Sequence, residues 1–133
     1  MSKWSQFLAD KSLGIMLAIA SISAGWIHLN FSNPPRFQAS PNFGPPVAAG
    51  LFFLALAIFQ FVWAVIVLVA VKNRLLMKIG ILGNLVSILI YFVSVVTPLP
   101  FGVPQQRILG FAMACKSVEA IFVVGALSTL VSK

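Results

Sequence analysis

The sequence predicts an all-α integral membrane protein built as a four-helix bundle, and three observations support this fold class. Of the 133 residues, 60% are hydrophobic and only 8% are charged, whereas soluble domains carry about 25% charged residues. Four apolar stretches are each long enough for a helix that crosses ~30 Å of hydrocarbon. Most basic residues stand at the ends of these stretches. The composition excludes a soluble domain, and also a disordered chain, because disorder needs low hydrophobicity and high charge.

The four stretches form one domain, residues 1–133, in the order span, loop, span, turn, span, loop, span. The first span runs through Trp26 and His28 without a convincing signal-peptide cleavage site, so we interpret it as a membrane helix. Five of the eight prolines lie in residues 32–46 and the other three in 98–106, and proline favours loops there because it interrupts helices. Residues 72–76 form a tight basic turn. The predicted spans are about 12–31, 47–71, 77–97 and 108–131.

The positive charges predict how the chain sits in the plasma membrane. Six basic residues at or near the span ends fall on one side, against Arg36 and Arg107 on the other. Because Lys and Arg favour cytoplasmic segments, we expect both termini and the 72–76 turn on the cytoplasmic side. The net charge is +7, but no basic cluster is longer than Lys72-Asn73-Arg74, so no nucleic-acid partner is predicted. The six residues are Lys3, Lys11, Lys72, Arg74, Lys78 and Lys133.

Small and polar residues recur along each span at alternating spacings of about three and four residues. A 3.5-residue period places such residues on one helix face and favours left-handed packing. Since small residues let membrane helices approach closely, we expect these faces to form the bundle core. They are Gly14, Ala18, Ser21, Gly25 and His28; Gly50, Phe53, Ala57, Gln60 and Ala64; Gly80, Asn84, Ser87, Tyr91 and Ser94; and Ala112, Cys115, Glu119, Phe122 and Ala126.

The candidate site is an intramembrane polar cluster of Lys116, Glu119, Gln60 and Asn84. Counting 1.5 Å per residue, Glu119 lies roughly 16 Å below the outer surface and the two amides roughly 20 Å, so we expect them to meet. Lys116 can pair with Glu119 at i, i+3. Charges inside a span cost at least ~2.5–3.5 kcal/mol each, so the pair either ties helices together or docks a neighbouring subunit. A proton or ion relay is the functional alternative.

His28 is expected near the outer end of the first span, as a hydrogen-bonded interfacial residue beside the loop that contains Phe37. One histidine cannot build a metal site alone, because such sites usually need three or four ligands. Cys115 and Glu119, at i, i+4, are only two dissimilar ligands on one helix. The sequence therefore predicts no metal, no cofactor and no catalytic residue. The single cysteine excludes an internal disulfide, and no nucleotide, protease or hydrolase motif occurs in the sequence.

Four short stretches carry a family resemblance: Trp26-Ile27-His28-Leu29, Gly50-Leu51-Phe52-Phe53-Leu54 followed by Gln60 and Trp63, Pro98-Leu99-Pro100-Phe101-Gly102, and Lys116-Ser117-Val118-Glu119-Ala120. From about residue 20 to 127 the chain resembles a family of small four-span membrane proteins of archaea and actinobacteria. Versions from ammonia-oxidising archaea look most similar, which implies a place among the small extra subunits of the archaeal ammonia monooxygenase, a copper-dependent membrane complex. Family members often carry a second histidine and an acid where this chain has Pro35-Arg36-Phe37-Gln38. That departure disfavours a copper-ligand role and favours a structural one.

The resemblance, with the lack of catalytic motifs, predicts a non-catalytic accessory subunit of a larger membrane enzyme. Its expected partners are lipids and other integral membrane subunits, copper monooxygenase subunits among them. Two alternatives remain open: a small transporter or ion-coupling protein that uses the polar cluster, and an accessory subunit of a respiratory oxidase. A stand-alone enzyme is disfavoured because the chain lacks a nucleophile–base pair and a cofactor motif.

Overall fold

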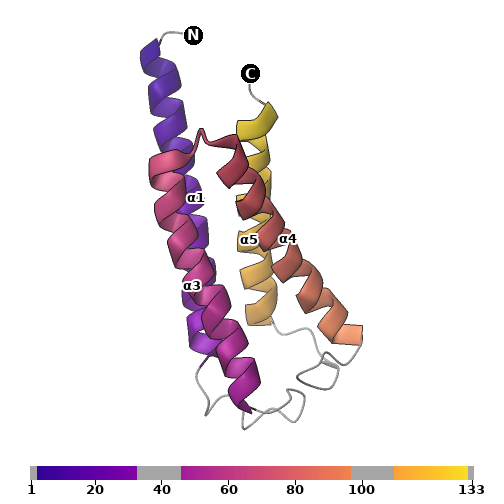
Figure 1. Ribbon diagram of the computed structural model, residues 1–133. Coiled ribbons are helices and arrows are strands. Elements are labelled where there is room, and N and C mark those ends of the chain that lie inside the picture. The colour runs from indigo at the N-terminus through magenta and orange to yellow at the C-terminus, as the bar shows by residue number, and fades with distance from the viewer. Residues whose placement is uncertain (1–2, 33–45, 97–109, 132–133) are drawn as a thin grey trace.

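The computed structural model describes residues 3–32, 46–96 and 110–131, which form four helices joined into one bundle (Figure 1). The helices are α1 (Lys3–Phe31), α3 (Pro46–Ala70), α4 (Arg74–Val96) and α5 (Gly110–Val131). Each is long and apolar enough to cross a membrane. The predicted all-α, four-helix membrane fold is confirmed. The main difference is at the start of the chain, where α1 begins nine residues before the predicted first span.

The helix ends follow from local sequence. α3 begins with Pro46, whose fixed φ suits the first position of a helix. Asn73 caps α4, because its Oδ1 accepts hydrogen bonds from two backbone amides of the first turn, both at 3.1 Å. At the end of α1, the backbone amide of Ser32 donates to the carbonyl oxygen of His28 at 3.0 Å. Local capping thus sets the start of α4, and the last backbone hydrogen bond of α1 comes from Ser32.

In the bundle, α1 lies beside α3 and α5, and α5 also lies beside α4 (Figure 1). The α3–α4 turn lies at the same end of the molecule as the start of α1 and the end of α5, and α4 leans away from α3 toward the opposite end. Two polar links join helices at the turn end. Lys72 Nζ lies 2.5 Å from Asp10 Oδ2, and the Arg74 guanidinium donates to the carbonyl oxygen of Leu130 at 2.7 Å.

The faces predicted to form the interior do form it. Every member of the four sets is buried or half-buried, apart from Ser94, whose side chain lies outside the described part. An apolar core fills the turn half of the bundle, while most of the buried polar side chains lie farther from the turn. The large apolar residues of that core include Leu17, Trp63, Val67, Met77 and Phe122.

Gly80 allows α4 to pass close to α3 near the turn. A Cβ at this position would lie 1.9 Å from the indole Nε1 of Trp63. The Trp63 ring stacks on Phe59, with ring centroids 5.1 Å apart, and a Cβ on Gly83 would lie 2.3 Å from Cζ of Phe59. Two glycines of α4 therefore receive two aromatic rings of α3, which is the small-residue packing expected between membrane helices.

Candidate functional site

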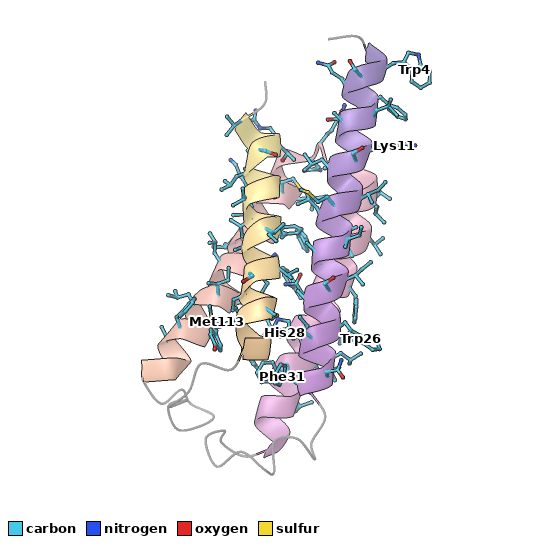
Figure 2. The ribbon with its side chains drawn as sticks, turned by 180° about the vertical axis from the view of Figure 1, so that it is seen from behind. Trp4, Lys11, Trp26, His28, Phe31 and Met113 are labelled. Carbon is cyan, nitrogen blue, oxygen red and sulfur yellow. The ribbon has the colours of Figure 1, made fainter. Side chains whose placement is uncertain are left out.

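A buried polar cluster lies between α1, α4 and α5, away from the α3–α4 turn. We define the Glu119 cluster as His28 of α1, Ser87 of α4, and Cys115, Lys116 and Glu119 of α5. All five residues are 7% exposed or less, and Figure 2 shows His28 on the side of α1 that faces α5. Three helices therefore place polar side chains in one volume inside the predicted membrane region.

Glu119 is the centre of the cluster. Its Oε1 lies 2.8 Å from His28 Nε2 and 2.9 Å from Ser87 Oγ, which donates to it. Its Oε2 accepts a hydrogen bond from Lys116 Nζ at 2.6 Å. Because an ionised carboxylate only accepts hydrogen bonds, His28 carries a proton on Nε2 in this arrangement. Both carboxylate oxygens are thus satisfied without water.

Lys116 and Glu119 form the i, i+3 ion pair expected from the sequence. Lys116 Nζ also donates to Ser87 Oγ at 2.8 Å and lies 6.0 Å from the centre of the Tyr91 ring. Breaking a buried ion pair is costly, since it leaves one charge uncompensated. Each charge here is compensated within the chain. Through Ser87 and His28 the pair also links α5 to α4 and α1.

His28 lies one turn before the end of α1, where the sequence analysis placed it, and its hydrogen-bonded side chain points into the bundle. It is 2% exposed, its ring stacks on Phe53 with centroids 5.9 Å apart, and it bonds to α5. The reason is that His28 belongs to the small-residue face of α1, which packs against α5. Phe37, named in that expectation, lies outside the described residues. Within the part of the chain that the structure describes, His28 Nδ1 has no hydrogen-bond partner.

Gln60 and Asn84 meet, as expected, but they form an amide pair of their own. Gln60 Nε2 donates to Asn84 Oδ1 at 2.9 Å, and Asn84 Nδ2 donates to the carbonyl oxygen of Gly80 at 2.9 Å. In the described ranges, no hydrogen bond joins Glu119 to either amide. The physical reason is that Ser87, about one turn beyond Asn84 on α4, occupies the place beside Glu119.

Three side chains of the cluster carry atoms that bind metal ions. His28 Nε2, Cys115 Sγ and Glu119 Oε1 lie within 4.8 Å of one another, and all three residues are buried. In the sequence, only Cys115 and Glu119 are close enough to be counted together as ligands, and His28 is 87 residues away from Cys115. The ligand count on which the expectation of no metal rested was therefore too low.

Ser87 and Cys115 belong to the site but not to the candidate site that the sequence predicted. The spacing puts both residues on interior faces, as it does His28 and Glu119, but spacing does not say which helices are neighbours. That information comes from the packing of α5 between α1 and α4.

The arrangement brings a carboxylate, an ammonium, an imidazole and a thiol into contact away from water. Such a group of side chains can fix helices to one another, exchange protons or bind a metal ion. Comparisons of this chain with protein-family models, with curated proteins and with solved structures find no match.

Proposed function

We propose that this chain is a non-catalytic accessory subunit of a multisubunit membrane enzyme, the copper-dependent ammonia monooxygenase of archaea that the resemblance implies. The observation that carries the proposal is a difference between the outward faces of α3 and α5. The exposed face of α3 carries large aliphatic side chains, whereas the described exposed side chains in the first half of α5 are small.

The outward face of α3 suits lipid. Its exposed large residues are aliphatic along the whole helix, from Leu51 to Val69. Lipid tails are as apolar as leucine, so such a face gains little by meeting another helix of the same kind. The exposed large residues are Leu51, Leu54, Ile58, Val62, Val65, Leu68 and Val69.

The outward face of α5 suits another helix. Among the described side chains from Gly110 to Ala120, the exposed positions are Gly110, Ala114, Ser117 and Ala120, and the larger exposed Ile121 follows them on the same face. Small residues at membrane helix surfaces allow close backbone contact with a partner helix. The Ser117 hydroxyl donates to the carbonyl oxygen of Met113 at 2.9 Å, so it needs no partner of its own. This face supports docking against an integral membrane subunit.

The Glu119 cluster lies directly behind this small-residue face of α5. Cys115, Lys116 and Glu119 occupy the inward side of the same turns and contact α1 and α4. These contacts hold α5 in one orientation relative to the bundle. A fixed surface reduces the conformational entropy lost on association, which supports a packing role for the chain.

The test is gentle detergent extraction of native membranes, followed by a native gel and mass spectrometry of the band that contains this chain. Co-migration with copper monooxygenase subunits in a fixed ratio supports the proposal. Co-migration with respiratory oxidase subunits replaces the proposed complex with another one. Migration alone, or as a small homo-oligomer, overturns the accessory role.

A matched pair of variants tests which face docks. In native membranes, Ala114→Cys on α5 is expected to form a crosslink to a partner subunit with a short membrane-permeant bifunctional reagent. Ile58→Cys on α3 is the control, because it is 55% exposed and lies on the aliphatic face. The native Cys115 is buried and gives the background. Equal crosslinking from both positions contradicts the assignment of α5 as the docking face.

A second candidate function is proton or ion coupling, and the continuous hydrogen-bonded path from His28 through Glu119 to Lys116 and Ser87 favours it. Intramembrane ionisable residues often form such relays. The test reconstitutes the purified chain in sealed vesicles and measures proton flux with a pH-sensitive dye inside them. A flux that is present in the unaltered chain and lost in Glu119→Gln supports coupling. No flux from the unaltered chain excludes it.

A further inference from the structure

We propose that His28, Cys115 and Glu119 form a binding site for a divalent late transition-metal ion of the zinc type. The donor atoms are an imidazole nitrogen, a thiol sulfur and a carboxylate oxygen, contributed by α1 and by two consecutive turns of α5. The inference comes from their geometry and chemistry, and it does not depend on the accessory role proposed above.

The donor atoms are already near the spacing that a metal requires. Bonds of ~2.0–2.3 Å at tetrahedral angles place two donors about 3.3–3.6 Å apart. Cys115 Sγ lies 3.5 Å from His28 Nε2 and 3.9 Å from Glu119 Oε1. The His28 Nε2 to Glu119 Oε1 distance of 2.8 Å is that of a hydrogen bond. Binding therefore requires small side-chain shifts that exchange this hydrogen bond for two metal bonds.

The donor set selects the kind of ion. Mg²⁺ and Ca²⁺ prefer oxygen ligands, whereas imidazole and thiolate suit zinc and its neighbours. A thiolate and a carboxylate together carry two negative charges, which match a divalent ion. The hydroxyl of Ser87 lies 2.9 Å from Glu119 Oε1, and it or a water molecule can supply a fourth ligand.

The surrounding side chains prepare the carboxylate for binding. Lys116 holds Glu119 Oε2 at 2.6 Å and leaves Oε1 directed at His28 and Cys115. Hydrogen-bonded outer groups of this kind orient metal ligands in proteins. When the ion binds, the imidazole proton moves from Nε2 to Nδ1, which has no hydrogen-bond partner among the described residues. The thiol of Cys115 gives up its proton to solvent as the sulfur–metal bond forms.

A variant of Lys116 distinguishes a metal site from a purely structural cluster. The positive charge of Lys116 lies next to the ligand carboxylate and opposes a cation at the site. Lys116→Met removes this charge and leaves Glu119 without its ion-pair partner. The variant is therefore expected to bind the ion several-fold more tightly than the unaltered chain, although it loses two native hydrogen bonds, to Glu119 and to Ser87. A purely structural cluster gives no such gain.

The experiment uses the purified chain in detergent. A chelator first removes any metal, and the chain is then titrated with Co²⁺ alone. The expected result is one equivalent of bound Co²⁺ that shows sulfur-to-cobalt charge-transfer absorption and tetrahedral visible bands, both removed by added Zn²⁺. Cys115→Ser is expected to lose the charge-transfer band, and His28→Gln is expected to weaken binding at least tenfold. Ser117→Ala, on the outward face of α5, is the control and keeps the spectrum.

Two results overturn the proposal. One is no saturable Co²⁺ binding by unaltered chain that retains its helical circular dichroism and its elution volume. The other is binding with an octahedral spectrum and no charge-transfer band, which indicates an adventitious ion. Because the decisive titration uses the unaltered chain, a variant that fails to fold does not affect it. The readout is independent of subunit partners, so this proposal and the accessory role can fail separately.

Discussion

His28 and Glu119 are 91 positions apart in the sequence, yet Nε2 of one lies 2.8 Å from Oε1 of the other. Their side chains are 3% and 0% exposed. The contact joins the first described helix to the last, and it lies farther from the turn than the apolar core that joins the same helices. Two different kinds of packing therefore hold α1 against α5 at two depths.

Removing the charge of Glu119 is expected to destabilise the bundle strongly. Glu119→Gln leaves the Lys116 ammonium buried without its counter-charge, and such a loss typically costs about 3–5 kcal/mol. The measurement is the free energy of unfolding in mixed micelles. A denaturing detergent unfolds the chain, and circular dichroism reports the loss of helix.

The double variant Glu119→Gln/Lys116→Met tests whether the unpaired Lys116 charge causes this loss of stability. It removes both charges, so we expect it to recover most of the stability lost in Glu119→Gln, because no unpaired charge remains. If the double variant is as unstable as the sum of the two single variants, the ion pair is not the source of the effect.

His28 is expected to contribute through its hydrogen bond to a charged acceptor. His28→Ala should cost about 1.5–3 kcal/mol of unfolding free energy. It should also speed maleimide labelling of Cys115 in the folded bundle, because Cys115 Sγ lies 3.5 Å from the imidazole. His28→Gln is the control, since its amide can still donate to Glu119. Unchanged stability and labelling in His28→Ala would mean that the α1–α5 contact depends on apolar packing alone.

The sequence was sufficient to predict the four helices and their interior faces, because both depend on local properties. Apolar length decides whether a segment spans the membrane, and a repeat of 3.5 residues decides which face lies inside. Lys116 and Glu119 were also predictable as a pair, since i, i+3 neighbours on a helix are close whatever surrounds them.

The composition of the Glu119 cluster depended on which helices are neighbours, and spacing alone does not contain that information. Glu119 and the pair Gln60–Asn84 were expected together because their estimated depths agreed. In the structure α5 lies against α1 and α4, so Glu119 meets His28 and Ser87 instead. Depth in the membrane was a useful constraint, but the order of helices around the bundle decided the contacts.

The orientation predicted from the basic residues is testable by labelling from outside. Lys72 lies at the turn, and its side chain is 75% exposed, whereas Asn30 lies at the opposite end of the bundle. In intact cells, a membrane-impermeant maleimide should label Asn30→Cys and should label Lys72→Cys only after the membrane is opened. The buried Cys115 in the unaltered chain gives the background signal. The reverse pattern would place the termini outside and contradict the positive-inside prediction.

The fit of Gly80 against Trp63 predicts a large effect from a single added methyl group. In Gly80→Ala the new Cβ would lie 1.9 Å from the indole nitrogen, so the ring must move or α3 and α4 must separate, at a cost of about 1–3 kcal/mol. Gly110→Ala is the matched control, because an added Cβ there meets no atom of the described residues within 4 Å and should change stability by less than ~0.5 kcal/mol. Unfolding free energies of both variants and the fluorescence maximum of Trp63, read in a Trp4→Phe/Trp26→Phe background, provide the measurement. Equal stability of the two variants, with an unshifted maximum, would show that α3 and α4 are not held together through this glycine.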